Sequence, residues 1–433
     1  MICFSRIRLL HLCFQSFMLG VLLVIGLSAK ADDTDDVLHP FWASRSIRRE
    51  TLLFVRESGE AHAKANLTFP IQNLFSVRQA AWSQGRQKTY VFGRDFIYSS
   101  GSRTLTLRQH STISFRNRAS FYSQTQGLPY KTKVSDPLNP YTPYGPSGKG
   151  PQLVYSDNEE PLQQVEVNYS YNTVWKGYVP KYQAVALRRT LQKLVSHQPM
   201  RLLVVGDSIS YGYGSSLLGG HEVLGYYPRR PGYASLLVSA LQRSYHTNAI
   251  RLENRAQPYI DSAQGAFDIG AQMTSSTDLV VVAYGMNDAA NGVQGRRQDR
   301  IAAYKANIKN ILNAIRAKNP AAEVILLAPM LGNPEWTRTL TPFFIKTSQF
   351  SAYSSIQQAL RELAAQTSGV AIADMTQLWH DLLAAKGWQY QNLLDGKPLT
   401  GWYDLSANGV NHPNDYGHLL YAQVLAGLLI PAK

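Results

Sequence analysis

The chain has 433 residues, of which 45% are hydrophobic and 17% charged, and its formal net charge is +14. This length predicts two domains, and this composition excludes a largely disordered chain. The basic residues are scattered and accompany no zinc-finger or other nucleic-acid-binding motif, so we expect the excess charge to favour solubility and expect no nucleic-acid partner.

Residues 1–31 have the organisation of a secretory signal peptide. A basic start, MICFSRIR, precedes a long apolar run that ends at an A-x-A cleavage signal at residues 29–31. The apolar run approaches the length of a membrane span, so a retained anchor is the alternative. Polar residues inside the run and the cleavage signal after it favour removal. We therefore expect a secreted or periplasmic protein that begins at Asp32 and keeps no stable membrane anchor.

Both cysteines, Cys3 and Cys13, lie within this leader. The mature chain would then contain no thiol. Disulfides, thiol catalysis and thiolate metal sites are excluded for such a chain.

Residues 32–180 are predicted to form a β-sandwich domain, with carbohydrate binding as one interpretation of its role. Short apolar runs of strand length alternate with turn residues, and residues 104–107 alternate with a period of two. A long loop rich in proline and glycine, residues 136–152, interrupts the strands. The number and length of the runs are typical of a sandwich.

Residues 181–433 are predicted to form an α/β domain with a parallel sheet covered by helices on both sides. Here strands alternate with helical patterns, and the strands show no apolar–polar alternation, so both of their faces should be buried. The first helical pattern places four residues on one apolar face, namely Leu187, Leu191, Leu194 and Val195.

Three unusual segments follow strands or precede the last helix of this domain: GDS at residues 206–208, GMND at 285–288 and HPNDYGH at 412–418. Each alone is typical of a turn or a helix cap. Open α/β sheets gather their chemistry at the carboxyl ends of the strands, and three such segments there are hard to attribute to chance.

Acyl transfer needs the residue types that these segments supply. Ser208 offers a hydroxyl nucleophile, His412 a base, and the Ser208 N–H and the Asn287 amide can donate to an oxyanion. Gly206 would allow a tight backbone turn, and Asp207 would cap the following helix.

These blocks resemble those of the SGNH hydrolases, also called GDSL esterases and lipases, over residues 200–429. The resemblance implies a flavodoxin-like sheet, with Ser208 as nucleophile and first oxyanion donor, Asn287 as second donor and His412 as general base. No phosphate-binding loop, zinc motif or Gly-x-Ser-x-Gly elbow is present, so we expect no metal and no cofactor.

The chain departs from the family pattern at the position three residues before the base. The acid that the family places there is replaced by Gly409. Asp404 is the tentative orienting acid. A backbone carbonyl is a second possibility, and an Asp415–His418 pair is the least favoured, since Asp415 is better placed to cap the last helix.

A second departure concerns the oxyanion hole. Asn254 stands where the family's second block has its asparagine, but Pro258 and Tyr259 stand where a glycine should donate its N–H. The hole then has two donors, or the Tyr259 backbone supplies the third.

The resemblance and the leader together predict an exported serine esterase. A leading β-sandwich resembles carbohydrate esterases of this superfamily, so the expected reaction is removal of O-acetyl groups from a polysaccharide through an acyl-Ser208 intermediate. The alternatives are a lipase or phospholipase of the same fold and a carbohydrate-binding protein whose hydrolase domain has lost activity.

Overall fold

A computed structural model describes residues 31–123, 152–153, 158–220, 224–290, 297–333, 348–387 and 400–432. The predicted leader, apart from Ala31, lies outside these ranges, as does the loop at 136–152 apart from its last residue. Within these ranges no helix is both long and apolar enough to cross a membrane. The same ranges hold no group of three or more His, Cys, Asp or Glu residues suited to a metal ion.

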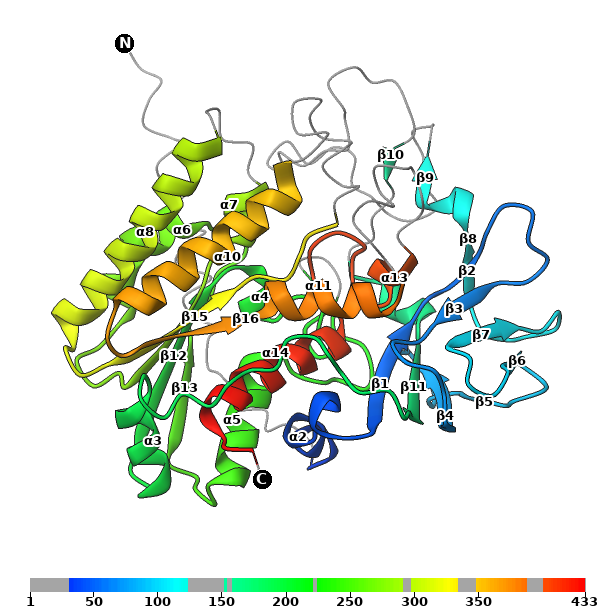
Figure 1. Cartoon of the computed structure of the whole chain (residues 1–433), viewed down its shortest axis with the longest axis horizontal. Helices are drawn as coiled ribbons and strands as arrows, with labels where there is room; N and C mark the ends of the chain where they lie inside the picture. Colours follow the sequence, from blue (N-terminus) through cyan, green and yellow to red (C-terminus); the bar gives the residue numbers. More distant parts are fainter. Residues whose placement is uncertain are drawn as a thin grey trace, which may run out of the picture.

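Five parallel strands form the sheet at the centre of residues 188–429, called here the parallel-sheet part (Figure 1). From one edge to the other they are β13 (Ile250–Asn254), β12 (Met200–Gly206), β14 (Leu279–Ala283), β15 (Glu323–Ala328) and β16 (Val370–Asp374). Numbered along the chain, the order is 2-1-3-4-5, the flavodoxin-like order, so the predicted fold class is confirmed. All residues of β14 and β15 are buried, as expected from strands without alternation.

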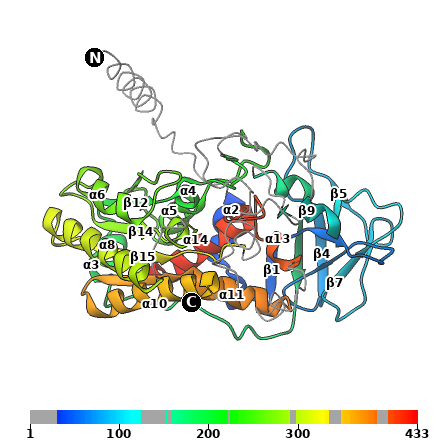
Figure 2. The same cartoon turned by 90° about the horizontal axis from the view of Figure 1, so that it is seen from above.

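Helices cover both faces of this sheet (Figures 1 and 2). One group packs in succession on one face: α6 (Ser262–Gln272), α8 (Arg297–Lys318) and α10 (Ser348–Gln366). A second group packs together on the other: α5 (Tyr233–Ser244), α14 (Asp415–Leu429) and α2 (Ala31–Leu38). The remaining helices are α3 (Arg188–Val195), α4 (Ser208–Tyr211), α7 (Met286–Ala290), α11 (Met375–Ala385) and α13 (Thr400–Tyr403).

The described residues between 46 and 170 form two larger sheets and one two-stranded sheet, and are called here the sheet-rich part. One sheet holds β1 (Ser46–Leu52), β11 (Val165–Ser170), β4 (Asn73–Gln79) and β5 (Thr89–Tyr90). The other holds β6 (Phe96–Ile97), β7 (Thr104–Leu107), β3 (Lys64–Asn66), β2 (Phe54–Arg56) and β8 (Phe115–Asn117). Shorter elements are β9 (Tyr122–Ser123) with β10 (Gln152–Leu153), and the 3-10 helices η1 (Phe41–Ala43), η2 (Arg118–Phe121) and η3 (Glu160–Gln163).

The predicted alternation at residues 104–107 is confirmed, since Leu105 and Leu107 of β7 are buried and Thr104 and Thr106, which alternate with them, are only half-buried. The pairing of β2 with β8 is parallel, so this sheet is not built of hairpins alone. The assignment of residues 32–180 to a β-sandwich domain stays a prediction.

Two details differ from the sequence-based expectations. Residues 31–38 form helix α2, which packs mainly on α5 and α14 of the parallel-sheet part and also pairs with Arg48 and Arg49 of β1. On α3, Leu191 and Leu194 are buried as expected, but Val195 is 65% exposed. At 100° per residue, Val195 lies about 80° around the helix from Leu187, at the margin of the apolar stripe.

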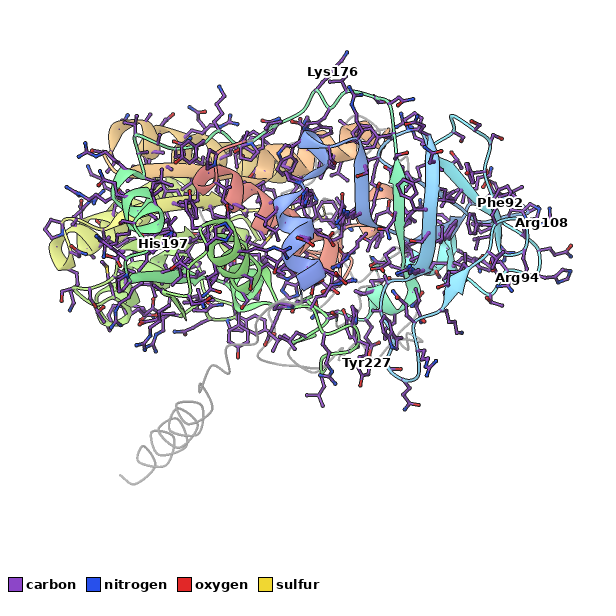
Figure 3. All side chains as sticks on the ribbon, turned by 90° about the horizontal axis from the view of Figure 1, so that it is seen from below. Phe92, Arg94, Arg108, Lys176, His197 and Tyr227 are labelled. Atoms are coloured by element: carbon purple, nitrogen blue, oxygen red, sulfur yellow. The ribbon has the colours of Figure 1, made fainter. Side chains whose placement is uncertain are left out.

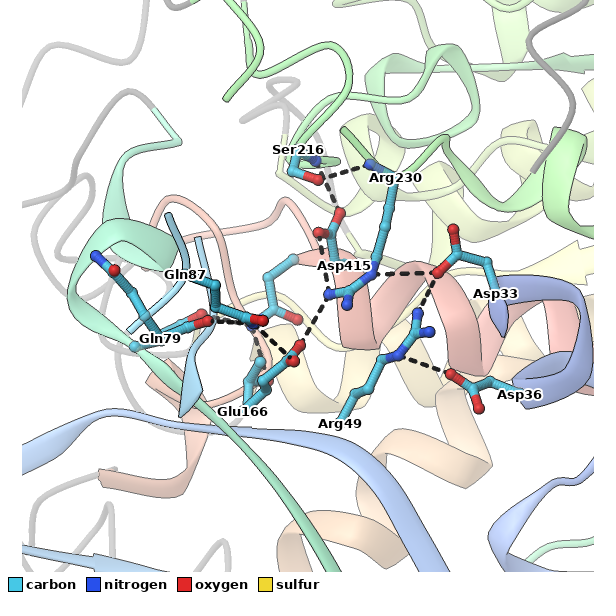
Figure 4. A network of polar contacts seen from close by, with 12 residues as sticks. Asp33, Asp36, Arg49, Gln79, Gln87, Glu166, Ser216, Arg230 and Asp415 are labelled. Atoms are coloured by element: carbon cyan, nitrogen blue, oxygen red, sulfur yellow. Dashed lines mark hydrogen bonds and ion pairs between the residues drawn. The ribbon is translucent and has the colours of Figure 1, made fainter. Parts of the chain in front are cut away.

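A buried polar network joins the two parts (Figure 4). The Arg230 guanidinium contacts three acids from three elements: Asp33 of α2 at 3.3 Å, Glu166 of β11 at 2.9 Å and Asp415 of α14 at 3.8 Å. Arg49 of β1 also pairs with Asp33. Because the hydrophobic core is one continuous cluster running through both parts, these ion pairs lie between parts that are already packed together.

Candidate active site

Ser208 lies where strand β12 turns into helix α4, at the carboxyl end of the sheet. Asp207 caps this helix, as predicted, by accepting a hydrogen bond from the Ile209 N–H at 3.0 Å. Position 206 has no room for a side chain, because a Cβ there would lie 2.5 Å from Ser210 Oγ and 2.7 Å from the carbonyl oxygen of Ala283. Glycine is therefore needed at this position. The turn therefore holds a buried Ser208, 5% exposed, as the first residue of a helix.

His412 lies beside this serine although 204 residues separate the two in the chain. Its Nε2 is 2.9 Å from Ser208 Oγ. The loop that carries the imidazole is wrapped around Asn408, whose Oδ1 accepts from the backbone N–H groups of residues 410–412 at 2.9, 2.9 and 3.0 Å. The Tyr213 ring packs edge-on against the imidazole, with ring centroids 5.5 Å apart.

The other ring nitrogen of His412 contacts a residue that the sequence did not suggest. Asn158, in the sheet-rich part, places its Oδ1 2.8 Å from His412 Nδ1. An amide oxygen can only accept, so Nδ1 carries the proton and Nε2 is left to accept the Ser208 hydroxyl. Asn158 is 254 residues from His412 and belongs to no recognisable motif, so no sequence signal pointed to it.

Asp404, the tentative orienting acid, is not at the imidazole. Its Oδ1 accepts the Leu53 N–H at 2.8 Å, and its Oδ2 pairs with Lys386 Nζ at 2.9 Å. Lys386 also pairs with Glu50 at 2.6 Å, so Asp404 belongs to a buried cluster that joins the two parts. Burial raises the pKa of Asp404 to about 6, although Lys386 acts to lower it.

The Asp415–His418 pair is also absent. Asp415 Oδ1 accepts the Ser216 N–H at 2.7 Å, and His418 Nε2 lies 3.0 Å from the carbonyl oxygen of Tyr213. The cap of α14 is Asn414, which accepts from the Gly417 N–H at 3.0 Å, so the prediction of Asp415 as the cap was wrong by one residue.

The backbone at residue 409 explains why the family's acid is missing there. Gly409 has φ 73°, in the left-handed region that disfavours side chains. A Cβ at this position would also lie 3.0 Å from Tyr403 Cε1. An aspartate at 409 would therefore be strained by both its backbone and its neighbour.

Asn287 lies in the first turn of α7, directly after β14. Its side-chain Nδ2 donates one hydrogen to the carbonyl oxygen of Ile260 at 2.7 Å, which leaves the second amide hydrogen for another acceptor. The Ser208 N–H lies at a helix start, where N–H groups have no partner within the helix. Both predicted donors thus sit at the carboxyl edge of neighbouring strands.

Tyr259 has φ 68°, the left-handed conformation that usually selects glycine. Tyr259 stands where the family has a glycine, so this position has the left-handed backbone conformation typical of glycine although it carries a side chain. Asn254 fixes the start of this segment, with its Nδ2 donating to the carbonyl oxygen of Ser210 at 2.7 Å.

Burial sets the charge state around Ser208. Burial, with a smaller contribution from His418, holds the pKa of His412 well below its ordinary value. The imidazole is therefore neutral at neutral pH, the form that can accept a proton. Burial also raises the pKa of Asp207 to about 7 and that of Asp288 to about 6. Neither carboxyl group is therefore fully ionised at mildly acidic pH.

The structure thus places a serine hydroxyl beside a neutral imidazole at the carboxyl edge of a flavodoxin-like sheet, an arrangement suited to nucleophilic attack by an activated serine. A model of the GDSL-like Lipase/Acylhydrolase family matches residues 204–420, half of the chain. The chain belongs to this family of ester hydrolases, and the predicted membership is confirmed. No curated protein matches the chain.

Several solved structures are similar in part. A two-domain esterase active on acetylated mannans is 14% identical, with TM-score 0.38, over 58% of this chain and 54% of that one, about half its length. A catalytic mutant of an acetylxylan esterase from Geobacillus stearothermophilus is 18% identical, with TM-score 0.37, over 54% and 95%. A lipase/acylhydrolase from Enterococcus faecalis is 14% identical, with TM-score 0.36, over 52% and 93%. The family model alone carries the assignment.

Proposed function

We propose that this protein is an exported serine esterase that removes O-acetyl groups from a polysaccharide. The observation that carries the proposal is the 2.9 Å contact between Ser208 Oγ and His412 Nε2 at the carboxyl end of the parallel sheet. A hydroxyl within hydrogen-bond reach of a base that is itself oriented by a third group is the arrangement of an activated nucleophile.

The reaction proceeds in two halves. Ser208 Oγ attacks the acetyl carbonyl while its proton passes to His412 Nε2, and the Ser208 N–H and the second Asn287 N–H stabilise the oxyanion. The carbonyl re-forms, the sugar oxygen leaves and takes the proton from His412, and an acetyl-Ser208 remains. A water molecule then attacks with His412 again as the base, which releases acetate and restores the serine.

The aromatic residues near the site favour a sugar polymer as the substrate. Trp82 and Tyr227 stack with ring centroids 5.8 Å apart and an interplanar angle of 14°, and Tyr227 is 43% exposed. Figure 3 shows Tyr227 on the outside of the molecule, near the meeting of the two parts. Its neighbour Tyr226 donates its hydroxyl to the carbonyl oxygen of Asn158 at 3.2 Å, which links this aromatic pair to the residue beside His412. With Trp82 stacked on it and Arg229 Cζ 5.3 Å from its centroid, the exposed Tyr227 ring offers an aromatic and cationic surface suited to contact with a sugar polymer.

The test is acetate release from a panel of acetylated xylans, mannans and other polysaccharides by the wild type and by Ser208→Ala. We expect release by the wild type and a loss of about 10³-fold or more in the variant, since the residual rate comes from the remaining binding groups alone. Ser275→Ala, an exposed serine in the turn after α6, is the matched control and should keep full activity.

Two outcomes would contradict the proposal in different ways. Hydrolysis of p-nitrophenyl palmitate with no release of acetate from any polysaccharide would assign the site to a lipase. Failure of the folded wild type to react with a fluorophosphonate probe, together with binding to polysaccharides, would assign the chain to a carbohydrate-binding protein without catalysis.

A further inference from the structure

We propose that Asn158, from the sheet-rich part, is the positioning residue of His412, so that the parallel-sheet part does not hold a complete catalytic site by itself. The kinetic effects expected from this inference rest on the proposed function. Its structural claim, that Asn158 orients the His412 imidazole, can be tested without turnover.

The two contacts of the imidazole define its orientation. His412 Nδ1 lies 2.8 Å from Asn158 Oδ1, and Nε2 lies 2.9 Å from Ser208 Oγ. Both are ordinary hydrogen-bond lengths. Asn158 is 2% exposed, so water does not compete freely for its amide oxygen. The three side chains therefore form a Ser-His-Asn chain in which the third member is neutral.

Asn158 is itself held in place. Its backbone has φ 63°, a left-handed conformation that asparagine and aspartate accept more readily than other side chains. Its carbonyl oxygen accepts the Tyr226 hydroxyl at 3.2 Å, and Tyr226 is buried. Two residues on, the Glu160 N–H donates to the carbonyl oxygen of Ala407 at 3.0 Å, in the loop that carries His412.

The segment that follows Asn158 is fastened to the His412 loop by further buried contacts. The Gln164 Nε2 donates to the carbonyl oxygens of Tyr403 and Ser406, at 2.6 and 2.9 Å, and its Oε1 accepts from Asn414 Nδ2 at 2.8 Å. The Glu160 carboxylate pairs with Arg116 at 2.6 Å, and both side chains are 2% exposed. Asn158 and His412 thus belong to one packed unit drawn from both parts.

A neutral partner differs from the usual carboxylate in a measurable way. It fixes the tautomer and the ring orientation but adds no negative charge to stabilise the imidazolium. Among the described residues, the titratable groups that act on or pack against the imidazole are His418 on α14 and Tyr213 after α4. Of these, His418 acts on His412 and lowers its pKa further, in the same direction as burial.

The experiment compares Asn158→Ala and Asn158→Asp in the full chain, using p-nitrophenyl acetate over a range of pH. Loss of the orienting contact in Asn158→Ala should lower kcat by about 10²-fold with little change in KM. Asn158→Asp keeps an acceptor and the left-handed backbone but adds a charge beside the imidazole. It should retain activity at high pH and move the acidic limb of kcat/KM upward by about 1–3 pH units. Asn73→Asp, at an exposed position of β4, adds the same charge outside the site. It should change neither kcat nor the pH of the acidic limb.

A second readout needs no turnover. Long-range proton–nitrogen NMR of the histidine rings, with His412 assigned from a His412→Gln sample, reports its tautomer and pKa. We expect the proton on Nδ1 in the wild type, a mixed tautomer in Asn158→Ala and a higher pKa in Asn158→Asp.

Each outcome decides the proposal. If the wild type hydrolyses no ester but the NMR changes occur as expected, the proposed function fails and the positioning role stands. If the wild type is active and neither the pH limb nor the His412 resonances move in Asn158→Asp, the positioning role is overturned and the esterase function is untouched. If Asn158→Ala does not fold, the Asn158→Asp measurements decide alone.

Discussion

Gly409 shows how a single backbone conformation separates this protein from the pattern of its family. The family's acid position is present, but its φ of 73° and a Cβ position 3.0 Å from Tyr403 Cε1 both disfavour an aspartate. The imidazole takes its partner from Asn158 instead.

Gly409→Asp should therefore not improve the enzyme. We expect a loss of about 1–2 kcal/mol in the free energy of unfolding from the left-handed backbone alone, and no gain in kcat. Urea denaturation and p-nitrophenyl acetate kinetics measure the two effects. Gly59→Asp is the matched control, with φ 81° but open space around its Cβ, so it isolates the backbone cost from the crowding at Tyr403. A rise in activity in Gly409→Asp would show that the loop can host an acid after all.

Sequence reasoning at this scale identified residues that belong to motifs and missed the one that does not. Ser208, Asn287 and His412 each sit in a recognisable block at a strand end, and the structure brings Ser208 and His412 together. Asp404 was the tentative orienting acid. The structure places its carboxylate against the Leu53 N–H and Lys386 and not at the imidazole. Nearness in sequence carries no information about a partner 254 residues away.

At the scale of elements, the strands and helices of the parallel-sheet part were predictable because their apolar runs are long and uniform. Helix α2 was not predicted. Half of the α2 sequence, ADDTDDVL, is aspartate, and its helix is stabilised by packing on α5 and α14 and by ion pairs with Arg49 and with Arg230, the latter remote in sequence. Tertiary contacts of this kind override a weak local pattern.

The short helix η3, which follows Asn158, depends on a buried ion pair, and Glu160→Gln tests this dependence. Arg116 is always charged and 2% exposed, so removal of its partner's charge should cost about 3–5 kcal/mol in the free energy of unfolding. Glu60→Gln breaks the surface pair with Lys64 and should cost about 0–1 kcal/mol. Chemical denaturation of both variants checks the difference, and equal losses would mean that η3 does not need the Arg116 contact.

For the whole molecule, the continuous core predicts one cooperative unfolding transition. The buried Lys386–Glu50 pair and the Arg230–Glu166 pair cross between the parts, so unfolding of either part would leave charged groups of the other without these partners. Far-UV circular dichroism and tryptophan fluorescence should give coincident denaturation curves. Lys386→Met should shift both curves to lower denaturant by the same amount. Two separate transitions, or a shift in only one probe, would show that the parts are energetically independent.

The location of Asn158 limits how such an enzyme can be rearranged by recombination. In a catalytic domain that carries its own acid, an accessory domain can be exchanged freely, because only substrate targeting changes. Under the proposed role of Asn158, the sheet-rich part supplies one hydrogen bond of the Ser208–His412–Asn158 chain, and Gly409 disfavours an acid in the His412 loop that could replace it. A chimera with a foreign leading region would keep Ser208 and His412 but lose the contact that orients the imidazole, so we expect the two parts to be exchangeable only together.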